Sequence, residues 1–365
     1  MKAIKIVGLF VLALVLFVGG VGVYAYYKYF DVEGDFVANF IQKNPEKSAL
    51  YWVRNDSLLV AHRPDAKMPL ASTVKIMVAI EFARQVGAGK LNPDERVALG
   101  EPARFYIAGT DGGAHPAWLA ELAKQQRDSA QTASLLDIAK GMIRHSSNAN
   151  TEYLMWRLGL PAINANLASL ALSPHDSLYP FTSALYVCSD ERSAKGLKLM
   201  PWSLYMERTQ QYFEDLKVDT TLKAKFNIAH VNGPVQRVWS DRLPGSTARV
   251  YGKLMQQIQG RTLLDSNAHA VLQTLLEWPM EAFDSNKERF VHLGAKGGST
   301  AFVLTYALYA EDKAGNTTQL VFLFNDLSSV ESTLLQAQLT DFQLRALSAN
   351  VADRQNILTI LKKNP

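Results

Sequence analysis

The sequence is poor in cysteine, shows little excess of either charge and contains no internal repeat. Its one cysteine, Cys188, excludes an internal disulfide framework and a zinc site built from a cysteine cluster. Seven scattered histidines form no H-E-x-x-H motif, so we expect no histidine-rich metal centre. The formal net charge is +4 without any long basic run, and we therefore expect no nucleic-acid partner. With 48% hydrophobic and 20% charged residues, the 365-residue chain can bury a sizeable core.

Residues 1–34 are predicted to carry the rest of the chain out of the cytoplasm. Residues 6–27 are uncharged, and 22 residues at 1.5 Å each reach about 33 Å, enough to cross a bilayer. Lysines precede this run and acidic residues follow it, which predicts a cytoplasmic N-terminus and an extracytoplasmic domain. The long apolar run and the lack of an A-x-A-like site favour an uncleaved single-pass anchor. Secretion after signal cleavage is the alternative.

Both ends of the exported part, residues 35–365, are predicted to form strands. Residues 49–62 contain two short apolar runs around Asn55-Asp56, which is typical of a hairpin. Residues 302–309 and 319–324 are rich in β-forming residues. Strands from the two ends can pair only if the chain returns to its start.

The middle of the exported part is predicted to be helical. Helical spacing of apolar residues predicts helices over 72–86, 134–158, 247–259, 266–276 and 330–347. Residues 174–196 are expected to form a long loop. We therefore expect an α/β (α+β) fold in which an antiparallel sheet of N- and C-terminal strands is flanked by helices. An all-helical subdomain is expected to be inserted at about residues 75–245.

The first motif whose side chains could take part in catalysis is the S-x-x-K sequence Ser72-Thr73-Val74-Lys75, at a predicted helix start. A serine and a lysine three residues apart lie on one helical face. A lysine that loses its proton in a dry, cationic pocket can activate a serine hydroxyl. Serine is also common at ordinary helix starts, so this motif alone is a weak signal.

Two further motifs follow along the chain. Ser146-Ser147-Asn148 lies between helical stretches, where a hydroxyl could relay a proton and an amide could hold substrate. By itself this segment is more typical of a cap or turn. Lys296-Gly297-Gly298 precedes the C-terminal strands, and its glycines leave room for a substrate backbone beside a strand.

Together the three motifs resemble those of the serine β-lactamase and penicillin-binding protein family, whose signature is S-x-x-K, S-x-N and K-[ST]-G. The resemblance is to the class A branch and covers nearly the whole exported part. It extends to segments that flank the motifs: Met68–Ala71, Met142–Ile143, Leu158–Ala162, Ser246–Thr247 and Leu275–Trp278.

The resemblance implies an active-site-serine hydrolase that acts through an acyl-enzyme without metal or organic cofactor. Ser72 would be the acylated nucleophile, Lys75 a base for acylation, and Ser146 the group that passes a proton to the leaving nitrogen. The substrate would be a β-lactam or a D-alanyl peptide of the cell wall. A penicillin-binding D-alanyl-D-alanine carboxypeptidase, or an idle relative that binds cell-wall peptide or a protein partner, remain alternatives.

The resemblance also implies where the substrate is held. Asn148 would bind the acylamino side chain, and Lys296 would supply positive potential for the substrate carboxylate. The backbone N–H groups of Ser72 and Ser299 would form the oxyanion hole, and Gly298 would leave the space that this arrangement requires.

Two positions depart from the family pattern. Gly297 stands where serine or threonine is usual, so a hydroxyl that contacts the substrate carboxylate is missing, and Ser299 or Thr300 are candidate replacements. The position of the glutamate that aims the deacylating water in class A enzymes aligns with Thr182. A hydroxyl is no base at neutral pH, so slow deacylation is expected. The nearest acids in the sequence are Asp176, Asp190 and Glu191, the last two interpreted as surface charges.

Overall fold

The computed structural model describes residues 35–362, which belong to two compact units. One unit comprises the N-terminal segment up to Asn44 and the C-terminal segment from Ser329, and the other comprises Pro45–Ser328. The predicted membrane-spanning run, residues 6–27, lies outside the described residues. Between residues 35 and 362, no helix is long and apolar enough to span a membrane.

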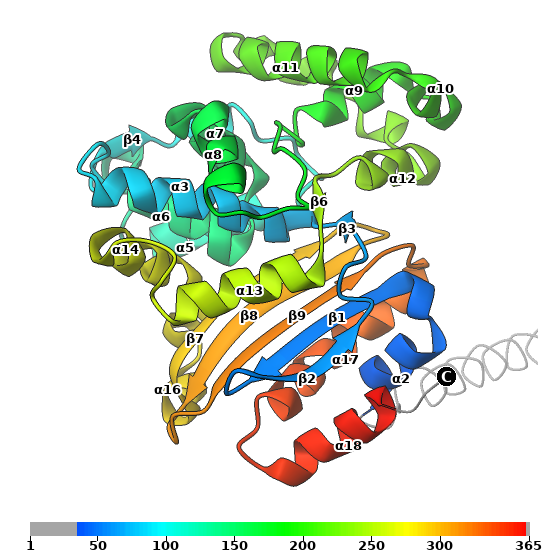
Figure 1. Ribbon diagram of the computed structural model, residues 1–365. Helices are drawn as coiled ribbons and strands as arrows, with labels where there is room; N and C mark the ends of the chain where they lie inside the picture. The colour runs from blue at the N-terminus through cyan, green and yellow to red at the C-terminus, as the bar shows by residue number, and fades with distance from the viewer. Residues whose placement is uncertain (1–34, 363–365) are drawn as a thin grey trace, which may run out of the picture. The chain divides into compact units, whose positions relative to one another are not determined.

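The larger unit is built on a five-stranded antiparallel sheet with the strand order β2-β1-β9-β8-β7 (Figure 1). Its strands are β1 (Ser48–Arg54), β2 (Ser57–His62), β7 (Phe290–Ser299), β8 (Leu304–Asp312) and β9 (Thr317–Phe324). The hairpin turns at Asn55 and Asp56, whose positive φ angles of 46° and 59° suit a tight turn. Pairing of β1 with β9, which sets Ser48 opposite Phe324, confirms that strands from the two ends of this unit share one sheet.

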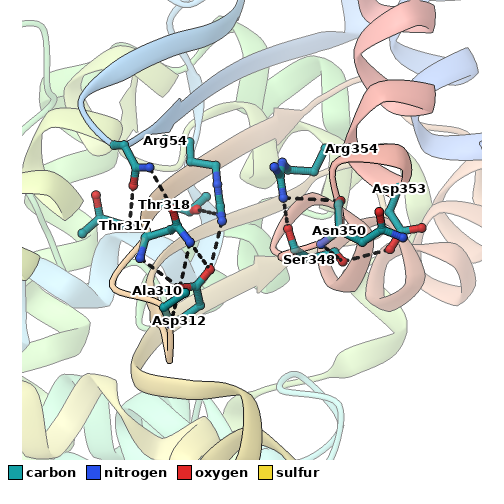
Figure 2. Close-up of polar contacts among 12 residues, drawn as sticks. Arg54, Ala310, Asp312, Thr317, Thr318, Ser348, Asn350, Asp353 and Arg354 are labelled. Carbon is teal, nitrogen blue, oxygen red and sulfur yellow. Dashed lines mark hydrogen bonds and ion pairs between the residues drawn. The ribbon is translucent and has the colours of Figure 1, made fainter.

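A buried ion pair ties the β8–β9 turn to β1 (Figure 2). Arg54 donates to Asp312 Oδ2 at 2.9 Å and to Thr318 Oγ1 at 2.8 Å. Asp312 Oδ1 in turn accepts the backbone N–H of Asn316 at 2.9 Å. Burial would raise the pKa of Asp312, but hydrogen bonds from Asn316 and Arg54 lower it overall, so the pair stays charged.

Most helices of the larger unit lie in the sequence between β3 (Met68–Pro69) and β6 (Gly245–Ser246), two short strands that pair with each other. The inserted elements are α3 (Lys75–Gly87), β4 (Arg96–Ala98), α4 (Gly100–Ala103), α5 (Ala114–Lys124), β5 (Thr132–Ser134), α6 (Leu135–Lys140), the π-helical turn Gly141–His145, α7 (Asn148–Leu158), α8 (Leu160–Ser169), α9 (Ala184–Glu191), α10 (Ala194–Leu199), α11 (Trp202–Val218) and α12 (Gly233–Asp241). The insertion is thus helical apart from the short β4–β5 ladder. The predicted fold class is confirmed.

The helix that carries the first motif lies at the centre of this unit. Residues 75–83 of α3 are all buried, and α3 packs against α7, α8 and α14 (Ser266–Leu276). A helix buried all round is typical of a core position. Helix α13 (Ala248–Gln259) lies across one face of the sheet and contacts β1, β8 and β9 (Figure 1). The short helices α15 (Trp278–Ala282) and α16 (Asp284–Arg289) lead into β7.

The expected long loop over residues 174–196 is wrong in its second half. The segment from Ala184 to Leu199 forms α9 and α10. Residues 184–189 of α9 are all buried, so this helix has no polar face and shows no amphipathic period in the sequence. Residues 174–183 lie outside any helix or strand and lead to the start of α9.

The smaller unit consists of α2 (Phe36–Lys43), α17 (Ser329–Ala346) and α18 (Val351–Leu361). Arg345 on α17 pairs with Asp35 at 2.7 Å. The turn between α17 and α18 is closed by Ser348 Oγ, which donates to Asp353 Oδ2 at 2.8 Å, and by Arg354, which donates to the Ser348 carbonyl (Figure 2). Asn350 caps α18 through the backbone N–H of Ala352.

Candidate active site

Ser72 and Lys75 lie in a helical turn that runs into the buried helix α3. Residues 71–74 form a 3-10 turn that opens with Ala71 in a left-handed conformation (φ 44°), and α3 begins at Lys75. Ser72 is partly exposed, whereas Lys75 is completely buried. The nucleophile candidate is therefore accessible to solvent, and the side chain of Lys75 is not.

The second motif brings a hydroxyl between two lysines. Ser146 occupies the break between the π-helical turn and α7 and has a left-handed backbone, with φ 68° and ψ 25°. Lys75 Nζ donates to the Ser146 carbonyl at 2.6 Å and to Asn148 Oδ1 at 2.7 Å, and lies 3.5 Å from Ser146 Oγ. Lys296 Nζ donates to the same hydroxyl at 3.0 Å and to the Gly297 carbonyl at 2.5 Å. Ser146 Oγ is thus within reach of both amines.

Burial sets the charge state of the two lysines. Burial lowers the pKa of Lys75 well below its usual range, and the charge of Lys296 lowers it further, while Asp111 and Glu152 act in the opposite direction. Burial also lowers the pKa of Lys296 to about 7. Burial therefore shifts both lysines towards the neutral amine, which is the form that accepts a proton.

The third motif lies against the turn that holds Ser72. A Cβ at Gly298 would lie 2.4 Å from the Ser72 backbone nitrogen and 2.8 Å from the Leu70 carbonyl oxygen. Thr305 on β8 fastens the two segments, since its hydroxyl donates to the Leu70 carbonyl at 2.7 Å and lies 2.8 Å from Thr73 Oγ1. Ser299 follows Gly298 as the exposed last residue of β7. The seven residues singled out from the sequence therefore come from the 3-10 turn 71–74, the start of α3, the residues from Ser146 to the start of α7, and the end of β7.

Comparison with known proteins finds a family model that matches part of the chain. Residues 35–182 match the model of the β-lactamase enzyme family, a region that contains the first two motifs. Over these residues the chain is similar to the β-lactamase enzyme family, and its fold is that of class A β-lactamases and of PBP-A. Among curated proteins, none matches the sequence.

Solved structures of the family share the fold at low identity. A β-lactamase from Sphaerobacter thermophilus superposes with a TM-score of 0.55 at 16% identity, covering 86% of this chain and 98% of its own. A β-lactamase from Chitinophaga pinensis gives 0.51 at 12% identity, covering 85% and 97%. A mutant of PBP-A, in an acyl-enzyme complex with penicillin G, gives 0.50 at 15% identity, covering 85% and 95%.

The departure at Gly297 from the family pattern has a structural reason. Tyr306 on β8 is the direct partner of Gly297, and a Cβ at position 297 would lie 2.8 and 2.9 Å from two carbons of its ring. The aromatic ring therefore fills the space of the usual side chain. Of the two candidate replacements, Thr300 Oγ1 already accepts hydrogen bonds from Ser240 Oγ at 3.0 Å and Phe302 N at 3.1 Å. Ser299 is exposed.

The structure places a carboxylate at Thr182 that we did not single out from the sequence. Glu152 on α7 is completely buried, and its Oε1 accepts the backbone N–H groups of Thr182 and Ser183, both at 2.8 Å. Its Oε2 accepts the Ser183 hydroxyl at 2.6 Å. Burial raises the pKa of Glu152 to about 7, although these hydrogen bonds and the charge of Lys75 act to lower it.

The spacing of Glu152 from Asn148 is the sequence feature that could have indicated it. It follows Asn148 by four residues, so the two side chains project from one face of α7. The acids chosen for their closeness in sequence have other partners. Asp176 pairs with Lys67, and Asp190 pairs with Arg208 at 3.1 Å. Within the described residues, no cluster of three or more histidine, cysteine or acidic side chains is arranged to hold a metal ion.

Proposed function

We propose that the protein is a class A β-lactamase-like serine hydrolase that forms an acyl-enzyme on Ser72 with β-lactams or with D-alanyl peptides of the cell wall. The observation that carries this proposal is the position of Ser146 Oγ, 3.5 Å from Lys75 Nζ and 3.0 Å from Lys296 Nζ. A hydroxyl between two buried amines provides a short route for a proton. The similarity to the β-lactamase enzyme family supports the same class of chemistry.

Acylation then needs only side-chain and backbone groups of this chain. Ser72 Oγ attacks the substrate carbonyl, and neutral Lys75 takes the hydroxyl proton. As the amide C–N bond breaks, Ser146 gives its proton to the leaving nitrogen and is reprotonated from Lys75. The backbone N–H groups of Ser72 and Ser299 stabilise the oxyanion, a contribution of roughly 3 kcal/mol for each donor. Lys296 attracts the substrate carboxylate, and Asn148 holds the acylamino group.

Deacylation is the slow step in this proposal. It requires a base that activates water on the acyl-enzyme, a contribution of about 10²- to 10⁴-fold. The Thr182 side chain supplies no base at neutral pH. Both oxygens of Glu152 already accept hydrogen bonds from residues 182 and 183. The acyl-enzyme should therefore accumulate. A PBP-A mutant that shares this fold was solved as an acyl-enzyme complex with penicillin G.

Intact-mass spectrometry after mixing with benzylpenicillin tests the proposal. We expect a mass increase of one penicillin per chain that persists over many minutes, and no increase in Ser72→Ala. Ser203→Ala on the exposed start of α11 is the matched control and should label like the wild type. Rapid turnover without accumulation would contradict slow deacylation. A folded wild type that never gains mass with penicillin or with a D-alanyl-D-alanine peptide would favour the alternative of an idle binding relative.

A D-alanyl-D-alanine carboxypeptidase is the second candidate, and it is favoured by the same lack of a free carboxylate at Thr182. Release of D-alanine from a cell-wall peptide at a rate above penicillin turnover would identify it.

We also propose that the domain works outside the cytoplasm, held by the N-terminal apolar run. The support is the uncharged stretch of residues 6–27, preceded by lysines. Protease added to spheroplasts should digest the domain, and the mature protein should start at Met1. A mature N-terminus near residue 28 would instead show signal cleavage.

A further inference from the structure

Glu152 is a buried ionisable group that takes no part in the proposed acylation steps. It lies one helical turn after Asn148, so about 5–6 Å separates the Cβ atoms of the two residues. Asn148 Oδ1 accepts a hydrogen bond from Lys75 Nζ at 2.7 Å. The same face of α7 therefore presents first an amide to the Lys75 amine and then, one turn later, a carboxylate.

The surroundings of this carboxylate are buried, and the charge of Lys75 acts on it. Lys75 and Glu152 are completely buried, and Lys296 is 3% exposed. Asp111 also raises the pKa of Lys75, and does so more strongly than Glu152, but it is only partly buried, so solvent screens its charge, whereas Glu152 is the fully buried acid. Two buried ammonium groups close to one hydroxyl repel each other, and a buried negative charge offsets that repulsion.

The hydrogen bonds of Glu152 attach a second segment to the site. Three donors from Thr182 and Ser183 converge on its oxygens at 2.6–2.8 Å. These residues immediately precede α9 and follow the loop that starts at Pro174. One side chain thus links the loop backbone to the helix that holds Asn148.

We propose that Glu152 is a positioning residue with two linked tasks: it is the buried countercharge of Lys75, and it fastens the Thr182–Ser183 backbone to α7. The first task controls how readily Lys75 gives up its proton, and so it deepens the proposed function. The kinetic test of this task, though not the NMR test, rests on that proposed function. The charged and titratable groups that face this pair are Lys296 from β7, Asp111 from the loop before α5, and Tyr186 from α9.

The decisive experiment titrates the Lys75 amine directly, without substrate. The protein carries ¹³C-labelled lysine, the Lys75 signal is assigned by its loss in Lys75→Arg, and its midpoint is followed by NMR. Glu152→Gln keeps a carbonyl oxygen for the two backbone N–H groups but removes the charge. We expect its Lys75 midpoint to fall by about one pH unit or more. An unchanged midpoint overturns the proposal.

A matched control is available on α3. Glu81 is also buried, 7% exposed, and accepts hydrogen bonds from Gln85 at 2.8 Å and Asn166 at 2.9 Å. Glu81→Gln should leave the Lys75 midpoint in place. An equal shift in Glu81→Gln would mean that any loss of buried charge acts on Lys75, which overturns the specific pairing.

A reciprocal variant keeps the test decisive if Glu152→Gln fails to fold. Coupling between two sites is symmetric, so Lys75→Met should raise the midpoint of the Glu152 carboxyl, followed with ¹³C-labelled glutamate, by a similar amount. No change there overturns the proposal.

The kinetic readout separates this inference from the proposed function. If the wild type labels with penicillin, the acid limb of its labelling rate should move to lower pH in Glu152→Gln, because a less basic Lys75 is neutral at lower pH. If the wild type does not label at all, the proposed function fails, and the two NMR titrations still decide the pairing.

Discussion

The backbone of Gly298 on β7 packs directly against the backbone of Ser72. A Cβ at position 298 would come within 2.4 Å of the Ser72 nitrogen. The nearest atoms are backbone atoms, which cannot swing away as the end of a side chain can. Glycine is therefore required here by the distance between two chain segments rather than by its own φ angle.

Gly298→Ala should separate β7 from the turn and spoil the oxyanion hole. Loss of one such donor typically lowers the rate by 10²- to 10³-fold, so we expect penicillin labelling to slow by at least 10²-fold. The control is Gly100→Ala, where a Cβ meets no atom within 4 Å. Labelling rates from intact-mass time courses measure both, and a wild-type rate in Gly298→Ala would contradict the close approach.

Ser146 combines a strained backbone with a functional hydroxyl. Its φ of 68° costs a non-glycine residue about 1–2 kcal/mol, which glycine avoids. We expect Ser146→Gly and Ser146→Ala to lose labelling alike, because both remove the hydroxyl between the lysines. In urea unfolding, Ser146→Gly should be the more stable of the two variants. Equal stability would show that the surroundings, and not strain, set the energy of this backbone.

Lys296 should destabilise the folded protein at low pH. Burial lowers its folded pKa to about 7, whereas an unfolded lysine has a pKa of about 10.4, so the folded state binds fewer protons between these values. Its unfavourable contribution, of the order of 5 kcal/mol, is complete below pH 7 and disappears as the pH rises towards 10.4. Lys296→Met should therefore be more stable than the wild type at pH 6. That difference should shrink by pH 10, as measured by denaturant unfolding.

Tyr306 should prevent restoration of the usual family residue at position 297. Gly297→Ser places a Cβ within 2.9 Å of the Tyr306 ring, and overpacking of this kind costs about 1–3 kcal/mol. The stabilities of Gly297→Ser, Tyr306→Ala and the double variant form a double-mutant cycle. We expect a favourable coupling energy of about 1 kcal/mol or more in the double variant. Additive effects would mean that the ring moves aside freely.

The sequence alone was sufficient for the fold class, and it singled out seven residues that lie together in the structure, but it did not single out Glu152. Local patterns carry this information: the hairpin turn at Asn55-Asp56, the S-x-x-K pair at a helix start, and strand-forming residues at the far end of the chain. Each depends on neighbours within a few positions, and the order of the three motifs then points to one family. The prediction of a loop over residues 174–196 was wrong where α9 forms. Residues 184–189 of this helix are all buried, so no alternation of polar and apolar residues marks it as a helix in the sequence.

Only the tertiary structure decided the pKa values of the buried lysines and which side chains from distant segments occupy the site. Glu152 reaches Thr182 across 30 positions of sequence, Tyr306 takes the space beside Gly297 from a neighbouring strand, and Lys296 reaches Ser146 from β7. Burial and the direction of a side chain depend on which segments pack together, and no local pattern records them. The chemistry of Lys75 follows from that packing, since its pKa is set by the removal of water and by charges that three separate segments supply.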